Sequence, residues 1–180
     1  MNITRRAAIR NLLIVTAGAA ILPSCFQERV SINLDNLDIN AEQEHILGSL
    51  SETIIPKTDT PGAKDMAAHL FTLKMIDDCY TKEEQKNFML GFEEFNKMVD
   101  SRYNKSFTKL KPQQQEELVA DLEKGTNIPE GIKSFYSSVK SLTVLGYTTS
   151  QYYLTKVKNF NLIPGKYQGS VVVNDLKPSV

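Results

Sequence analysis

Apolar residues recur every three to four positions along most of the chain between residues 42 and 148. This spacing places them on one face of an α-helix and predicts helices that are buried on that face. The first two predicted helices cover residues 42–55 and 63–80, and a third follows a capping box at residues 81–84. The third carries the strongest apolar stripe of the chain: Phe88, Phe92, Phe95, Val99 and Tyr103.

Two later helices are predicted from prolines and from the apolar pattern that follows each of them. Pro112 fits the first turn of a fourth helix, which ends near Gly125. Pro129 begins a fifth helix, with Gly146 just past its end. The apolar positions of both helices predict faces that pack against the first three.

The regular pattern ends soon after residue 150. A short sixth helix is predicted around Tyr152 and Tyr153, capped by Thr149 or Ser150. From Lys156 onward the helical period is lost. The sequence therefore predicts an all-α fold, a compact orthogonal helical bundle of about five to six helices with an irregular C-terminal arm.

Residues 54–63 join the first two predicted helices. Pro56 cannot continue a helix, because it lacks an N–H group and its ring clashes with the preceding turn. Thr60 and Pro61 predict that the next helix begins here, with a hydroxyl at the N-cap and a proline at N1. Gly62 lacks a side chain, so another backbone or a ligand could approach closely. The stretch predicts a tight corner between two helices.

Charged residues are unevenly distributed along the chain, and this bears on its partners. The 180-residue chain has 21 basic and 21 acidic side chains. Residues 1–24 hold Arg5, Arg6 and Arg10 and no acid, so the remainder has a net charge of −3. An acidic body argues against nucleic acid or an anionic membrane surface as the main partner. Two cysteines, Cys25 and Cys79, do not make a disulfide framework.

The N-terminal residues resemble an export signal. Arg5 and Arg6 form a twin-arginine pair, and the apolar run at 12–22 that follows is too short to span a ~30 Å hydrocarbon core. Residues 22–25 look like a lipobox that ends at Cys25. The alternative, an ordinary buried first helix, would leave the arginine pair incidental. A competing pattern of small residues at 17–19 lies midway through the apolar run, the wrong place for cleavage.

These features predict how the chain is divided. We expect a twin-arginine signal over 1–24, a lipid on Cys25, a polar tether over 26–40, a helical body over 41–173 and a tail over 174–180. As a flexible coil, the tether would reach about 20 Å. The protein is then expected in the periplasm as a membrane-anchored lipoprotein.

Residue types that carry chemistry do not converge in the sequence. The glycines form no phosphate-binding motif, and neither His45 nor His69 has a partner at metal-ligand spacing. Carboxylates at Asp77 and Asp78 disfavour the thiolate of Cys79. Adjacent acidic pairs such as Asp77-Asp78 lie about 100° apart on a helix, so they are expected on solvated faces. We therefore expect no catalytic, cofactor-binding or metal residues in this chain.

An export signal without a cofactor site points to a partner. The twin-arginine route carries folded proteins and is used chiefly when a cofactor must be loaded first. One explanation is that the cofactor belongs to a second protein that lacks a signal and travels with this chain. Four tyrosines near the C-terminus would suit a surface that another protein covers, and packing of the C-terminal arm on the bundle explains them equally well.

Several motifs carry a resemblance to a known family. They occupy residues 52–63 (ETIIPKTDTPGA), Phe107 with 112–114, 135–136, 140–143, 146–150 and 164–169. With them the chain resembles the gluconate 2-dehydrogenase subunit 3 family, the small accessory subunit of membrane-linked dehydrogenases. The string at 54–63 is the specific part, and the aromatic C-terminal motifs agree with it.

The resemblance implies a non-catalytic role. Such a subunit accompanies a flavin-dependent catalytic subunit of the glucose–methanol–choline (GMC) type, which oxidises sugars, sugar acids or polyols, and a cytochrome c passes the electrons on. FAD, and c-type haem where a cytochrome is present, are then expected in the partners and not in this chain. The resemblance also implies that this chain helps to export, stabilise and anchor the catalytic subunit.

The expected docking surface combines the corner with the C-terminal aromatic motifs. Its residues are Pro56, Thr58, Asp59, Thr60, Pro61, Gly62, Tyr147, Tyr152, Tyr153, Pro164, Gly165 and Tyr167. The alternative function is a free-standing periplasmic lipoprotein that binds a small sugar or glycan in a cleft near Gly62. Purification separates the two, because an accessory subunit would co-purify with an FAD-bearing protein.

Overall fold

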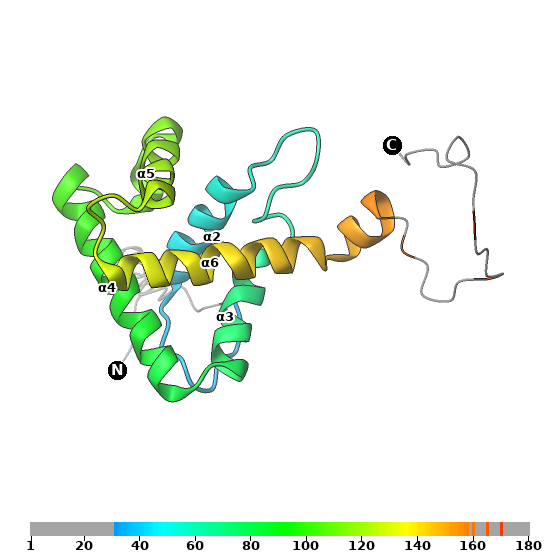
Figure 1. Ribbon diagram of the computed structural model, residues 1–180, viewed down its shortest axis with the longest axis horizontal. Coiled ribbons are helices and arrows are strands. Elements are labelled where there is room, and N and C mark those ends of the chain that lie inside the picture. Colours follow the sequence, from blue (N-terminus) through cyan, green and yellow to red (C-terminus); the bar gives the residue numbers. More distant parts are fainter. Residues whose placement is uncertain (1–30, 159, 161–164, 166–169, 171–180) are drawn as a thin grey trace, which may run out of the picture.

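A computed structural model of the protein describes residues 31–158, 160, 165 and 170 (Figure 1). Within these residues the chain forms five α-helices, two short helices of other types and no strand. The elements are α2 (Ala41–Ile54), α3 (Ala68–Cys79), α4 (Lys82–Tyr103), η1 (Phe107–Lys109), α5 (Pro112–Lys124), α6 (Glu130–Thr148) and η2 (Tyr153–Val157). The predicted all-α bundle is confirmed. Long α6 runs across the other helices and contacts α2, α3 and α4 (Figure 1).

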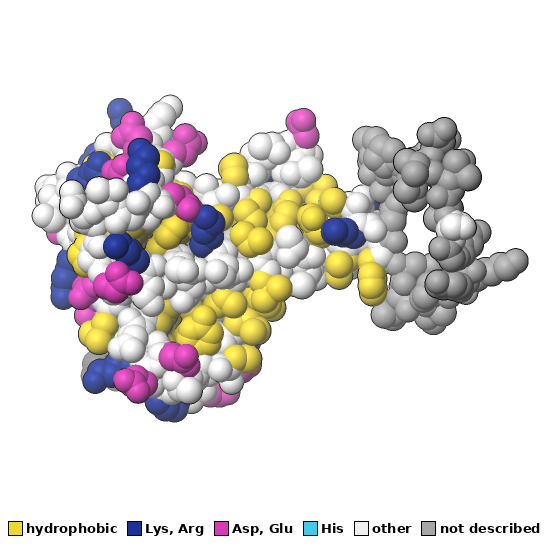
Figure 2. All heavy atoms as spheres, viewed as in Figure 1, with side chains coloured by type: hydrophobic (Ala, Val, Ile, Leu, Met, Phe, Trp, Pro, Cys, Tyr) yellow, Lys and Arg dark blue, Asp and Glu magenta, His cyan; other side chains and the backbone are white. Residues whose placement is uncertain are grey.

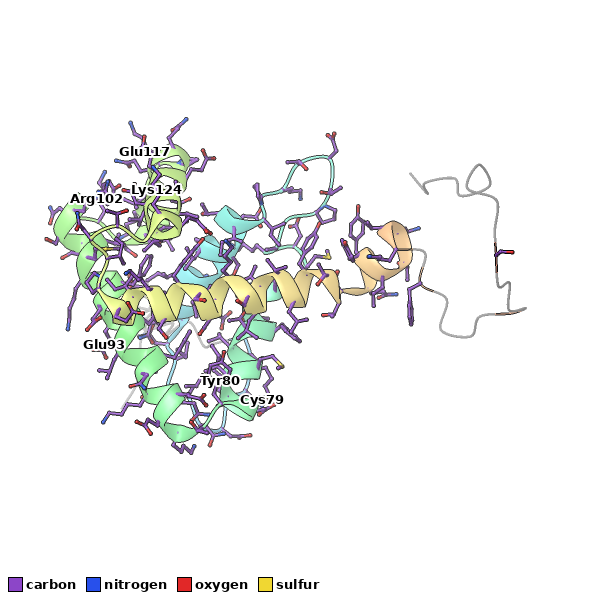
Figure 3. The ribbon with its side chains drawn as sticks, in the orientation of Figure 1. Cys79, Tyr80, Glu93, Arg102, Glu117 and Lys124 are labelled. Atoms are coloured by element: carbon purple, nitrogen blue, oxygen red, sulfur yellow. The ribbon has the colours of Figure 1, made fainter. Side chains whose placement is uncertain are left out.

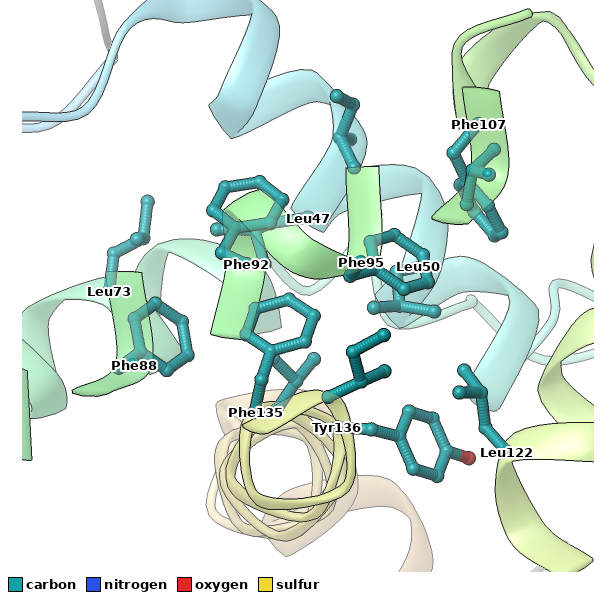
Figure 4. Close-up of a cluster of buried hydrophobic side chains, with 14 of the residues drawn as sticks. Leu47, Leu50, Leu73, Phe88, Phe92, Phe95, Phe107, Leu122, Phe135 and Tyr136 are labelled. Atoms are coloured by element: carbon teal, nitrogen blue, oxygen red, sulfur yellow. The ribbon is translucent and has the colours of Figure 1, made fainter. Parts of the chain in front are cut away.

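The core forms where the apolar stripe of α4 meets α6. Phe135 of α6 lies among Phe88, Phe92 and Phe95 of α4, with ring centroids 5.1, 5.0 and 5.5 Å away (Figure 4). The rings of Phe92 and Phe135 are stacked, and all four side chains are buried. Aromatic pairs of this kind contribute about 0.5–1.5 kcal/mol beyond their buried area. The predicted stripe is therefore the centre of the fold.

A glycine allows α4 and α6 to approach this closely. A Cβ atom added at Gly91 would lie 2.8 Å from the Cβ of Phe135 and still closer to the carbonyl oxygen of Gly131. Any side chain at position 91 would push the two helices apart. Gly91 therefore fixes how deeply α6 packs onto the aromatic stripe.

Several predicted helix ends are confirmed. Thr81 and Glu84 form the capping box at the start of α4, where the Thr81 hydroxyl accepts from the Glu84 amide and the Glu84 carboxylate accepts from the Thr81 amide. Pro112 occupies the first turn of α5. The expected end before Gly146 is wrong, because α6 continues to Thr148.

The N-terminal part of the described chain differs from the expected tether. Residues 31–40 lie against the bundle, and their Leu37 and Ile39 are buried in the core. Asp77, expected on a solvated face, is buried as well, whereas its neighbour Asp78 is exposed. Both differences have one cause, since the Asp77 side chain binds the backbone of this segment.

Candidate functional site

The corner between α2 and α3 keeps the expected position but has a different form. Thr60 does not cap a helix, because α3 begins only at Ala68, after a turn in which Ala67 has a positive φ of 52°. Residues 56–60 form an exposed loop whose tip is closed by a bond from the Thr58 amide to the Thr60 carbonyl, 3.0 Å. Behind the loop, the Ala63 amide donates to the Ile55 carbonyl at 2.9 Å.

The side chain of Glu52 fixes this loop by binding its backbone. One carboxylate oxygen accepts from the Lys57 amide and the other from the Lys64 amide, each at 2.9 Å. The carboxylate occupies the space beside Gly62, where an added Cβ would lie 2.5 Å from Oε2 and 2.7 Å from Cδ. The group that approaches Gly62 is therefore a side chain of this protein. Glu52 was not among the predicted site residues, although it is the first residue of the 52–63 motif.

Tyr147 connects the corner to the end of α6. Its hydroxyl donates to the Pro61 carbonyl at 2.9 Å, and its ring meets that of Tyr153 edge to face with centroids 6.0 Å apart. Ser150 begins the final helical turn by accepting from the Tyr153 amide, as predicted for one of the two candidate caps. The structure thus brings three predicted elements of the docking surface together: the corner, Tyr147 and Tyr153.

Exposed apolar side chains gather at the same end. Of the five large hydrophobic residues that are exposed in the described chain, four lie on α6 or close to η2. They are Val144, Leu145, Val157 and Phe160. Hydrophobic side chains cover the C-terminal half of α6 and the neighbouring α3 in Figure 2. We call loop 56–62, Tyr147, Tyr152, Tyr153 and these four residues the tyrosine end.

Not every predicted docking residue can be placed. Tyr152 is half-buried. Gly165 is exposed, and no heavy atom of the described residues lies within 4 Å of an added Cβ there. Pro164 and Tyr167 lie outside the described residues, as do Arg5, Arg6 and Cys25 of the expected signal and lipidation site. Within the described residues, no helix is both long enough and apolar enough to cross a membrane.

Charge at the corner is paired but exposed. The Lys57 ammonium lies 2.9 Å from the Asp65 carboxylate, and this hydrogen bond lowers the pKa of Asp65. Because both side chains face solvent, the pair contributes little to stability. Lys57 also lines a groove of about 430 Å³ between α2 and α5, together with Glu52, Lys64 and Gln115 among others. Among the described residues, no aromatic ring lines this groove and offers a stacking surface for a sugar.

Reactive residue types are dispersed over the described structure. Burial lowers the pKa of His69, whose ring packs over Gly48 and whose Nδ1 has no hydrogen-bond partner in the described residues. His45 is exposed, and Cys79 is an exposed thiol at the far end of α3 (Figure 3). In the part of the chain that the structure describes, no three His, Cys, Asp or Glu residues come close enough to hold a metal ion.

Comparison with known proteins identifies the family. Residues 41–165 match the family described as gluconate 2-dehydrogenase subunit 3, which covers all the described helices. No curated protein and no solved structure matches the chain. Because the match extends over well more than half of the 180 residues, the chain belongs to the gluconate 2-dehydrogenase subunit 3 family.

Proposed function

We propose that this chain, an accessory subunit of a dehydrogenase complex by its family, serves a flavin-dependent catalytic subunit of the GMC type in the periplasm. The catalytic subunit oxidises a sugar, sugar acid or polyol with its own FAD, and a cytochrome c, where present, receives the electrons. This chain does not catalyse the reaction. It escorts the catalytic subunit through the twin-arginine route, stabilises it and anchors it through a lipid on Cys25.

The observation that carries the proposal is the composition of the tyrosine end. A loop fixed by Glu52 and Tyr147 lies beside four exposed large hydrophobic residues at one end of the body. Protein interfaces favour tyrosine and apolar side chains at their centre and have few charges there. Between residues 141 and 158 the only charged side chains are Lys156 and Lys158, and loop 56–62 adds Lys57 and Asp59. This end therefore suits contact with a second protein.

A charge placed in this surface tests docking. Leu145→Asp puts a carboxylate at a position that is 43% exposed, so the body should remain folded. Leu90→Asp is the matched control, because Leu90 is 48% exposed on α4, away from the tyrosine end. We expect L145D to reduce the recovery of the flavoprotein with this chain about tenfold or more, and L90D to leave it unchanged. Equal recovery with both variants would contradict docking at this end.

The export role has a separate test. Changing Arg5 and Arg6 to lysine should leave both this chain and the flavoprotein in the cytoplasm. Fractionation followed by dehydrogenase activity in each fraction measures this. Unaltered periplasmic activity of the partner would refute the escort role.

The groove beside Glu52 supports one alternative, a lipoprotein that binds a small sugar or glycan on its own. Its location near Gly62 fits that idea, whereas the absence of aromatic rings among its described lining residues does not. Calorimetry with the purified chain distinguishes the two functions. A monomer that binds sugar without a flavoprotein would favour the alternative.

A further inference from the structure

A buried carboxylate holds the N-terminal end of the described chain. Asp77, near the end of α3, is 1% exposed, yet it accepts three hydrogen bonds from backbone amides of one short segment. The donors are the amides of Asp35 at 2.9 Å, Asn36 at 2.7 Å and Leu37 at 2.9 Å. Both carboxylate oxygens accept hydrogen bonds, so the backbone of the segment is bound at three successive residues.

Further contacts extend this attachment in both directions. The Asn36 side chain donates to the Asp77 carbonyl at 3.0 Å and accepts from the Lys82 ammonium. Leu37 and Ile39 enter the core beyond it. On the other side, the Ser31 amide donates to a carboxylate oxygen of Glu44 at 2.7 Å. The whole of residues 31–40 is therefore fixed to the bundle at several points.

The segment lies outside the part of the chain that matches the family, which begins at residue 41. It also bears directly on the lipid anchor of the proposed function. If residues 31–40 were free, 16 peptide units would join Cys25 to the first helix, with a largest span of about 55 Å. With Ser31 fixed, six units remain, with a largest span of about 20 Å.

We infer that residues 31–40 form a strap docked on Asp77, and that in the lipidated protein this strap holds the body within about 20 Å of the bilayer surface. This inference rests on the lipid anchor of the proposed function. The strap replaces a long tether by a short one, so a catalytic subunit bound to the body stays close to the membrane. The Asp77 carboxylate thus binds the chain's own backbone. The amides of residues 35–37 donate to it and compensate its negative charge.

Hydrogen exchange of the full-length protein in liposomes tests the strap. Asp77→Asn removes the negative charge and one of the two acceptor oxygens while keeping the side-chain shape. We expect it to speed exchange of the amides at 35–37 about tenfold or more and to leave the core of α4 and α6 protected. Asp78→Asn is the matched control, since it alters an exposed carboxylate that also pairs with Lys74. Asn36→Ala loosens the strap from the other side and leaves α3 intact.

The same liposomes test the short tether. Energy transfer from a dye on the exposed thiol of Cys79 to dyes on lipid headgroups should be strong in the wild type and weaker in D77N and N36A. Fully unprotected amides at 35–37 in the wild type would overturn the strap, as would exchange that D77N and N36A leave unchanged. The mass of the N-terminal peptide reports the lipid separately. A lipid-free Cys25 would overturn the anchor and the tether length, whereas exchange would still decide whether the strap is docked.

Discussion

Replacing Gly62 by alanine tests how the corner is built. The new Cβ would fall 2.5 Å from Oε2 of Glu52 and nearer still to its other oxygen, well inside van der Waals contact. The carboxylate is the end of a flexible side chain, so it can move away. By moving it gives up its bonds to the amides of Lys57 and Lys64, both 2.9 Å long. The cost of the substitution is therefore the cost of these two bonds.

The geometry gives the expected magnitude. Hydrogen bonds to a charged group contribute about 1.5–3 kcal/mol each, and partial exposure of Glu52 places these two at the low end, about 3 kcal/mol together. The methyl group also lowers the conformational entropy of the unfolded chain, and this stabilises the folded state by about 0.4–1 kcal/mol. We expect Gly62→Ala to lower the free energy of unfolding by about 2–2.5 kcal/mol. In urea this is a shift of the midpoint by about 1 M.

A double-mutant cycle isolates the mechanism. In a Glu52→Ala background no carboxylate remains to be displaced, so Gly62→Ala should be neutral or stabilising by about 0.4–1 kcal/mol. The destabilisation caused by Gly62→Ala should thus disappear or change sign in the Glu52→Ala background. Gly165→Ala is the control, because no atom of the described residues lies within 4 Å of an added Cβ there. If Gly62→Ala costs the same with and without Glu52, the carboxylate does not determine the cost and the reasoning is refuted.

Three further predictions concern the core and the contacts that cross the fold. Gly91→Ala should cost about 3 kcal/mol, measured by urea unfolding, because the added methyl meets the backbone oxygen of Gly131, which cannot move aside cheaply. Tyr147→Phe should cost about 1 kcal/mol in the same assay, because it removes one hydrogen bond to Pro61. Burial raises the pKa of Asp77, but its three backbone donors and Lys74 outweigh burial and lower it below its usual value. Its stabilisation is therefore complete above the unfolded pKa of about 3.9 and is lost as the pH falls through the lower native pKa. Thermal unfolding between pH 2 and 6 should show this loss in the wild type, and D77N should show a shallower pH dependence.

Much of the fold followed from signals that act within a few residues. The apolar period identified α4 and its aromatic stripe, the Thr81 capping box marked its start, and Pro112 marked the start of α5. The motif at 52–63 indicated the family, which the match over 41–165 confirmed. These signals are readable because capping and helical periodicity depend on neighbours three or four positions away.

The docking residues themselves remain a prediction, and the sequence explained only part of their arrangement. The sequence indicated the corner and the C-terminal tyrosines from separate motifs. The structure joined them through a hydrogen bond between residues 86 positions apart, from Tyr147 to Pro61. It also replaced the expected helix start at Thr60 with a loop that the carboxylate of Glu52 holds.

The sequence by itself determined an all-α body, most of its helix ends and its family. Only the tertiary structure decided the form of the corner and the docking of residues 31–40. The physical reason is the same in both places. Glu52 and Asp77 each bind backbone amides with a carboxylate, and the amides that Asp77 binds are 40 to 42 residues away. From the sequence alone, a charged side chain on a helix is expected to face solvent. Whether it instead binds free backbone amides depends on how the helices pack, because packing decides which segments come close to it.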